Sequence, residues 1–189
     1  MINKQYNKNG LVGDISDWSK KDPRIHRVLS MLVDHILMCL VVLPMAILIF
    51  VVLLILENHI NKYFILPLLF FPFFIYLNKD FLKSKSPAKR ILGYQVISKK
   101  SNSPASELQC FIRNLTIFII WPLEVIVGLI NPERRIGDFL ANTKVVKADK
   151  EELKMLWTDL KAVKFRTSYL LIILIAFVYG FGFKHIIMD

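Results

Sequence analysis

The chain of 189 residues is 54% hydrophobic, has a mean hydropathy of +0.47 and carries a formal net charge of +10. This length suits one domain, and the hydropathy exceeds that of a typical soluble domain, so the composition predicts an all-α integral membrane protein. Nucleic-acid binding is not expected, because the basic residues are spread over three separate segments in the way that membrane topology demands.

Residues 1–24 are polar and mixed in charge, without the short apolar core and small-residue cleavage site of a signal peptide. We expect them to form a polar cytoplasmic N-terminus. The apolar segment that follows is therefore expected to stay in place as a membrane anchor.

Two apolar stretches come next in the chain. The first, 28–56, predicts a helix of about 43 Å, longer than the roughly 30 Å hydrocarbon core, and Pro44 is expected to bend it. The polar turn 57–62 separates it from the second stretch, 63–77, so the two predict a helical hairpin. The second helix is short, and we expect it to be extended beyond Lys79, whose ammonium group would reach to the membrane surface.

The distribution of basic residues predicts how the chain is oriented in the membrane. Segments 1–27, 78–104 and 131–167 hold six, seven and nine of the 25 Lys and Arg residues. The positive-inside rule places all three in the cytoplasm. The apolar stretch 105–130 therefore has to enter the membrane and return, whereas the clean stretch 168–187 is long enough to span it.

The pair Trp121–Pro122 is the expected turning point of that re-entrant or interfacial hairpin, because proline interrupts a helix. The alternative is a single crossing that puts Arg134 and Arg135 outside. Two β-prone pieces flank the hairpin, 91–97 and 143–148, and we expect them to pair as a small two-stranded cytoplasmic ribbon. The predicted fold thus has three spanning helices, one such hairpin and the ribbon.

The sequence divides after the ribbon. We expect a membrane domain over 25–147, an amphipathic cytoplasmic helix within 148–167 and an additional spanning helix over 168–189. The amphipathic helix either lies on the inner membrane surface or packs on protein. Its pattern is carried by Leu153, Leu156, Trp157, Leu160, Val163 and Lys164.

Arg27 and Asp34 stand seven residues apart where the first apolar stretch begins. On a helix they share a face, with Ser30 between them, about 10 Å apart along the axis, which is too far for a direct bond. If residues 36–56 fill the hydrocarbon, Asp34 lies near its inner boundary and Arg27 in the headgroup layer.

An unpaired charge at that depth is costly, so each of the two needs a partner from elsewhere in the chain. The candidates are Arg113, Arg134, Arg135 and Asp138. One interpretation is a structural ion-pair network. The other is a proton or cation site in which Asp34 titrates, with His35 or His26 as a shuttle.

These residues and two motifs, "SPAKRILGYQVI" at 86–97 and "RRIGDFLANTKVV" at 134–146, resemble the RDD family of small bacterial membrane proteins. The resemblance covers roughly 24–147, and the stretch beyond it looks particular to this chain. In the family name the arginine corresponds to Arg27, the first aspartate to Asp34 and the second to Asp138. Ser86 and Ala88 replace the more typical Thr and Gly of the first motif.

The resemblance implies a multi-pass protein of the bacterial cytoplasmic membrane with its N-terminus inside, and relatives associated with sodium–proton exchange. We expect cation/proton transport by an Arg/Asp cluster, in a homo-oligomer. The alternative is a non-catalytic scaffold or subunit that binds a protein partner or anionic lipid headgroups. No enzyme, cofactor or metal site is expected, because hydrolase, P-loop and metal motifs are missing from the sequence. Cys39 and Cys110 are expected to be free small hydrophobes.

Overall fold

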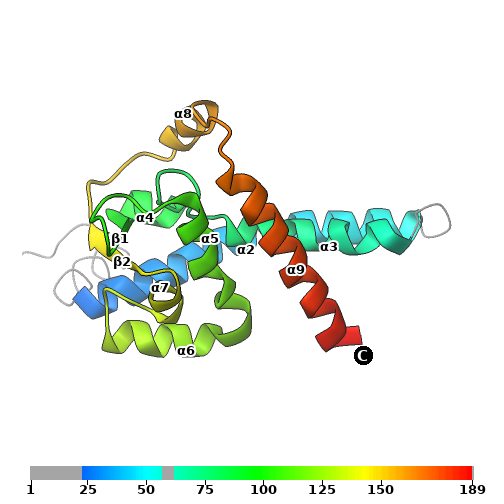
Figure 1. Ribbon diagram of the computed structural model, residues 1–189, viewed down its shortest axis with the longest axis horizontal. Helices are drawn as coiled ribbons and strands as arrows, with labels where there is room; N and C mark the ends of the chain where they lie inside the picture. Colours follow the sequence, from blue (N-terminus) through cyan, green and yellow to red (C-terminus); the bar gives the residue numbers. More distant parts are fainter. Residues whose placement is uncertain (1–22, 57–61, 189) are drawn as a thin grey trace, which may run out of the picture.

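The computed structural model describes residues 23–56 and 62–188, which form eight helices and one two-stranded sheet. Two long helices, α2 and α3, extend together from a group of shorter elements that contains α4 to α7 and both strands (Figure 1). Helix α9 packs against α3 and α5. The prediction of a mainly helical chain with one small ribbon is therefore confirmed.

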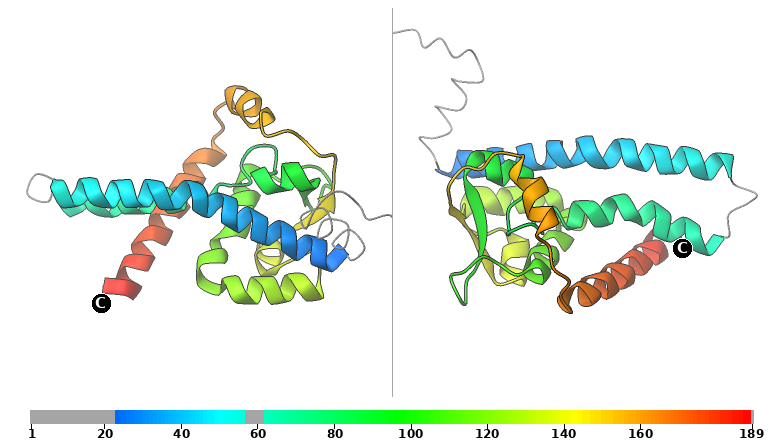
Figure 2. Two further views of the ribbon diagram at one scale, coloured as in Figure 1. Left: turned by 180° about the vertical axis from the view of Figure 1, so that it is seen from behind. Right: turned by 90° about the horizontal axis from the view of Figure 1, so that it is seen from above.

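Helix α2 (Pro23–Ile55) continues through Pro44 and packs along α3 (Lys62–Leu77), as Figure 2 shows from two sides. The two helices form the arms of the expected helical hairpin. Its turn falls on residues 57–61, which lie outside the described residues. From Ile36 onward most large side chains of α2 are exposed, which is the pattern of a helix surrounded by lipid.

Helix α4 (Pro87–Leu92) begins and ends at residues of the first motif. The hydroxyl of Ser86 accepts a hydrogen bond from the backbone N–H of Lys89 at 3.3 Å and so caps the helix. Pro87 takes the first helical position, where no backbone N–H is needed. Gly93 ends the helix with φ of +74°, a left-handed conformation that glycine adopts without steric cost.

Strands β1 (Tyr94–Ser98) and β2 (Thr143–Lys147) pair antiparallel, with Val96 opposite Val145. The ribbon expected between 91–97 and 143–148 is therefore present. Its first strand begins three residues late, because the chain up to Leu92 completes α4.

The third apolar stretch forms α5 (Glu107–Leu115) and α6 (Ile117–Ile130), and the chain bends by 111° between them. The break lies at Ile120, whose backbone is not helical, rather than at Trp121–Pro122 as expected. Pro122 instead falls in the first turn after the break, where its missing N–H removes no hydrogen bond.

Both ends of this bent segment are held together. The ribbon joins the strands that precede and follow it, and Gln109 Nε2 donates to the carbonyl oxygen of Ala141 at 3.1 Å. A single crossing would separate the two ends by the membrane thickness of roughly 30 Å. The geometry therefore favours the returning hairpin over the single crossing.

Helix α7 (Ile136–Leu140) precedes β2, and α8 (Met155–Lys161) and α9 (Ser168–Met188) follow it. Helix α8 is much shorter than the region 148–167 assigned to an amphipathic helix. Buried apolar side chains of α3, α5 and α9 form one core, which includes Leu77, Phe111, Ile172 and Ala176.

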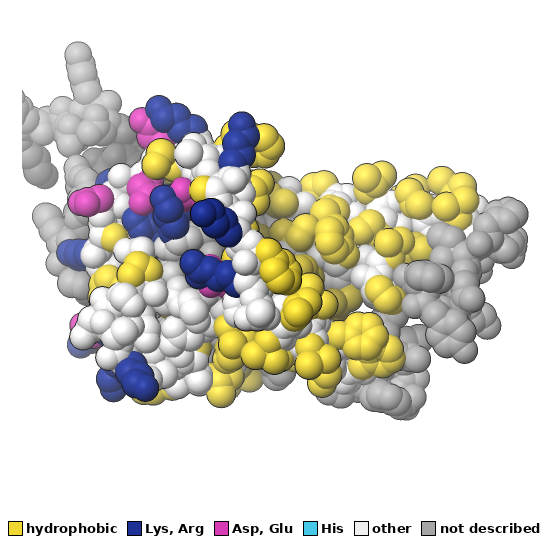
Figure 3. Space-filling model, turned by 45° about the horizontal axis from the view of Figure 1, so that its top comes forward, with side chains coloured by type: hydrophobic (Ala, Val, Ile, Leu, Met, Phe, Trp, Pro, Cys, Tyr) yellow, Lys and Arg dark blue, Asp and Glu magenta, His cyan; other side chains and the backbone are white. Residues whose placement is uncertain are grey.

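In the described part of the chain, the helix Arg24–Ile55 is long and apolar enough to cross a membrane. The bent pair α5–α6 reaches the required length only when its two helices are counted together. The apolar parts of α3 and α9, Pro67–Leu77 and Ser168–Gly182, are shorter. Figure 3 shows hydrophobic side chains over the half of the molecule that contains α3, α9 and the later part of α2, with charged side chains gathered on the other half. The arrangement with three spanning helices stays a prediction.

Candidate functional site

Charged side chains from α2, the α3–α4 connection, α4, α5, α6 and the start of α7 meet where these elements pack together. We call this set the buried ion cluster, and each of its side chains is at most 5% exposed. Five are basic and four acidic, a formal surplus of one positive charge. The cluster consists of Arg27, Asp34, Lys79, Asp80, Lys89, Arg113, Glu124, Arg135 and Asp138.

Asp34 is bound by two lysines that follow α3. Lys89 Nζ lies 2.8 Å and Lys79 Nζ 3.5 Å from Asp34 Oδ2. The same Lys89 ammonium group also lies 2.7 Å from Asp80 Oδ1, and so bridges two carboxylates. Lys79 was expected to reach the membrane surface, and this expectation is wrong because its side chain is only 3% exposed.

Arg113 joins the other two aspartates of the cluster. Its Nε donates to Asp138 Oδ1 and its Nη1 to Asp80 Oδ2, each at 2.7 Å. The planar guanidinium group presents several donors in fixed directions, which lets one side chain satisfy both carboxylates. Asp138 also accepts from the Thr143 hydroxyl at 2.7 Å, which ties the cluster to β2.

Helix α7 packs close to α5 and α6 because it contains a glycine. A β-carbon at Gly137 would lie 1.9 Å from the carbonyl oxygen of Arg113, so no other residue fits here. The Gly137 N–H donates to Glu124 Oε1 at 2.9 Å, and the Thr116 hydroxyl donates to the same oxygen. The close approach brings Asp138, the next residue, within reach of Arg113.

Arg27 and Arg134 make their hydrogen bonds to backbone oxygens. Arg27 Nε donates to the carbonyl of Pro132 at 3.2 Å, and Arg134 Nε donates to the carbonyl of Thr143 at the same distance. The guanidinium of Arg134 also stacks on the ring of Phe139. Arg134 therefore lies at the edge of the site and outside the cluster.

Five of the six residues proposed from the sequence are thus brought together, namely Arg27, Asp34, Arg113, Arg135 and Asp138. The expected partners of Asp34 were wrong: it binds Lys79 and Lys89, and Arg113 binds Asp80 and Asp138 instead. Sequence reasoning placed neither lysine in the site and missed Asp80 and Glu124. Lys89 lies in the first motif and Glu124 in an apolar helix, and both features were available signals.

The two histidines near Asp34 have other partners. His35 Nδ1 lies 2.7 Å from the Tyr76 hydroxyl, and the ring stacks against Trp121. His26 Nδ1 lies 2.5 Å from the hydroxyl of Tyr94. These contacts favour a packing role for both side chains over a proton-shuttle role.

Burial and neighbouring charges shift the pKa values of Asp80, Asp138 and Lys79 in the cluster. Burial raises the pKa of Asp80 and of Asp138, but neighbouring cations outweigh it and hold both pKa values below the usual range. The cations are chiefly Lys89 and Arg113 for Asp80, and Arg113 and Arg135 for Asp138. Lys79 lies two residues beyond α3, and burial lowers its pKa to about 8 although Asp34 opposes the shift.

Two buried oxygen atoms of α2 accept no hydrogen bond. Among the described residues, Asp34 Oδ1 and Ser30 Oγ are buried and have no hydrogen-bond partner, and Ser30 lies one helical turn before Asp34. Both oxygens of Asp80 and Asp138, in contrast, accept hydrogen bonds. One carboxylate oxygen of Asp34, Oδ1, therefore has no hydrogen-bond donor in the cluster.

A second set of ion pairs holds the chain around α8 on the body of the protein. Arg90 is fully buried and binds Glu151 at 2.5 Å and Asp159 at 2.7 Å. Lys85 pairs with Glu151, and Lys83 with Asp159. The polar side of α8 thus faces the protein.

No group of three or more His, Cys, Asp or Glu within residues 23–56 and 62–188 has the geometry to hold a metal ion. Cys39 and Cys110 are free thiols. The site is an array of buried, closely paired charges, and its observed chemistry is ion pairing.

A long apolar helix fixed at one end by a buried Arg/Asp cluster defines a class of membrane protein rather than a soluble domain. Residues 23–186 match the model of the RDD family. The chain belongs to the RDD family, as the motifs indicated. The match ends at residue 186, so it includes α8 and all but the end of α9. The expectation that the stretch beyond 147 is particular to this chain is therefore wrong. No curated protein and no solved structure matches the chain.

Proposed function

We propose that this chain is a multi-pass protein of the bacterial cytoplasmic membrane, with its N-terminus inside, that exchanges a proton for a small cation at Asp34. The observation that carries the proposal is the unused buried oxygen of Asp34, one helical turn after the unused hydroxyl of Ser30. Carboxylate and hydroxyl oxygens are suitable ligands for hard cations.

Lys79 releases the proton in the proposed exchange. Its ammonium group makes the longer of the two lysine contacts to Asp34, and its pKa of about 8 is close to physiological pH. Loss of one proton from Lys79 leaves the Asp34 carboxylate with less compensating charge, and entry of one monovalent cation restores the balance. The total charge of the site is unchanged by this exchange.

The small number of long apolar helices limits what one copy can do. A pathway across the membrane requires more helices than one chain offers, so we infer that transport takes place in a homo-oligomer. The proposed protein is not an enzyme and uses no cofactor.

The test is ion flux in proteoliposomes that contain a pH-sensitive dye. An imposed sodium or potassium gradient should drive proton movement with the wild-type chain, and Asp34→Asn should abolish it. The matched control is Asp149→Asn, which removes an exposed carboxylate. Absence of flux from wild-type protein that unfolds cooperatively would contradict the proposal.

The second candidate is a non-catalytic scaffold or subunit. It is favoured by Asp80 and Asp138, whose oxygens are fully engaged, so that these two aspartates join α4, α5 and α7 to one another and to the α3–α4 connection. Under this function, Asp34→Asn lowers the yield of folded protein and the amount of a copurifying membrane partner. Wild-type protein then carries no ions.

A further inference from the structure

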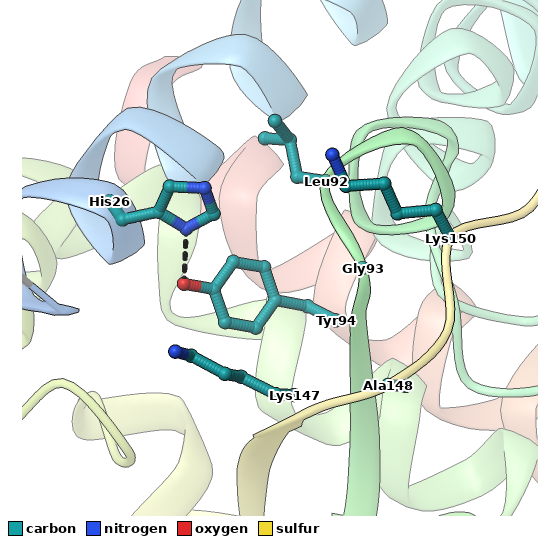
Figure 4. Close-up of a pocket in the computed structure, with 7 residues that line it drawn as sticks. All are labelled: His26, Leu92, Gly93, Tyr94, Lys147, Ala148 and Lys150. Carbon is teal, nitrogen blue, oxygen red and sulfur yellow. Dashed lines mark hydrogen bonds between the residues drawn. The ribbon is translucent and has the colours of Figure 1, made fainter. Parts of the chain in front are cut away.

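A basic pocket lies at the start of α2, away from Asp34. Its volume is about 260 Å³, and it is enclosed by α2, the junction of α4 with β1 and the end of β2. The residues that line it are His26, Leu92, Gly93, Tyr94, Lys147, Ala148 and Lys150 (Figure 4). Three of these seven are basic and none is acidic.

The frame of the pocket is fixed by short contacts. A β-carbon at Gly93 would lie 2.7 Å from the carbonyl oxygen of Ala148, and the Ala148 N–H donates to the Gly93 carbonyl at 2.9 Å. Tyr94 pairs with Lys147 across the ribbon. The backbone wall of the pocket is therefore set by the ribbon and does not depend on the lysine side chains.

Two polar groups lie at the hydroxyl end of Tyr94. Figure 4 shows the His26 ring directed at this hydroxyl from one side and the ammonium end of Lys147 on its other side, whereas the ammonium end of Lys150 lies beside Leu92. Burial raises the pKa of Tyr94, although Arg27 opposes the shift, so the phenol stays protonated at neutral pH and keeps a hydrogen to donate. The exposed Lys147 and Lys150 side chains are free to close over a bound group.

The pocket lies close to the start of the exposed apolar part of α2. His26 precedes Leu32, an exposed large hydrophobic residue of α2, by six positions, or about 9 Å along the helix. Polar headgroups occupy several ångströms beyond the hydrocarbon core. The volume is just below the roughly 300–1,000 Å³ of drug-sized ligand sites, so the pocket fits a headgroup and not an acyl chain.

We propose that this pocket binds the phosphate group of an anion, carried either by an anionic lipid headgroup or by a soluble phosphate ester. Two lysines supply charge-assisted hydrogen bonds to the phosphate oxygens, and His26 and Tyr94 supply the floor. The site is separate from Asp34 and does not depend on ion exchange there.

The test uses the full chain in amphipol, so that lipid vesicles stay intact, with binding measured to four probes. The lipid probes are vesicles of phosphatidylcholine with and without phosphatidic acid, and the soluble probes are glycerol 3-phosphate and inorganic phosphate. Lys147→Gln combined with Lys150→Gln should weaken binding about tenfold or more, since loss of one charged hydrogen bond already has this effect. Lys147→Arg combined with Lys150→Arg should retain it.

The matched control is Lys99→Gln combined with Lys100→Gln, which removes two exposed lysines just after β1. It should leave binding unchanged within about twofold, since its lysines lie outside the pocket. Binding to vesicles alone assigns the phosphate to a lipid, and binding to glycerol 3-phosphate assigns it to a soluble ester. Equal loss in the control pair, or no binding of any probe by folded protein, overturns the proposal.

Discussion

Lys89 Nζ lies 2.8 Å from Asp34 Oδ2, although 55 positions separate the two residues in the sequence. Through this contact the short helix α4 is fixed to the membrane helix α2. Because Lys89 also binds Asp80, one ammonium group bridges two carboxylates on this side of the cluster.

Replacing Lys89 should destabilise the protein strongly. In Lys89→Met the carboxylates of Asp34 and Asp80 lose their shared partner while they stay buried, and breaking a buried ion pair costs about 3–5 kcal/mol. The free energy of unfolding in detergent should fall by that amount. The control Lys99→Met alters an exposed lysine and should change it by less than about 0.5 kcal/mol. A loss of similar size in both variants would show that the ion pair is not responsible.

Lys79 should make stability depend on alkaline pH. Burial lowers its pKa from 10.5 to about 8, so between these values the unfolded chain binds more protons than the folded one. Stability contributed by this group therefore rises with pH through this window. Lys79→Met should lack the rise. The free energy of unfolding of wild type, relative to that of the variant, should therefore increase by up to roughly 3 kcal/mol between pH 8 and pH 10.5.

Chemical unfolding in detergent at several pH values measures that difference. Lys100→Met, an exposed substitution, should run parallel to wild type over the whole range. A pH-independent difference between wild type and Lys79→Met would mean that Lys79 titrates normally.

The two ends of the bent segment α5–α6 should be accessible from the same side of the membrane. In a background with Cys39→Ala and Cys110→Ala, we expect Leu108→Cys and Asn131→Cys to react with an impermeant thiol reagent in inverted vesicles only. Ile55→Cys, at the far end of α2, should react in right-side-out vesicles. Opposite labelling of Leu108→Cys and Asn131→Cys would establish a single crossing.

Helix α8 should insert its apolar side into the membrane surface. Trp157 and Leu160 are 65% and 52% exposed, whereas Asp159 faces Arg90. With Trp18→Phe and Trp121→Phe, the fluorescence of Trp157 should shift to the blue in nanodiscs and be quenched by brominated lipid. Emission at the wavelength of water-exposed tryptophan would mean that α8 does not contact lipid.

Much of the site was predictable because buried charges are rare in apolar sequence. Arg27, Asp34 and Arg113 stand out against their hydrophobic surroundings, and Asp138 lies in a motif. Lys79 and Asp80 do not stand out, since they follow an apolar stretch in a position typical of residues at the membrane surface. Their burial depends on α2, α4 and α5 meeting around the end of α3, where they supply Asp34, Lys89 and Arg113 as partners, and periodicity does not reveal this packing.

The sequence by itself determined the class of protein, the long first helix and the two strands of the ribbon. These features depend on local composition and on spacing along the chain, which a single segment already contains. Only the tertiary structure decided that Asp34 binds Lys79 and Lys89, and that Arg113 bridges Asp80 and Asp138. Helical spacing shows which residues share a face, but the partner of that face depends on how α4, α5 and α7 pack. A β-carbon at Gly137 would lie only 1.9 Å from the carbonyl oxygen of Arg113, so α7 packs this closely on α5 only with glycine at this position.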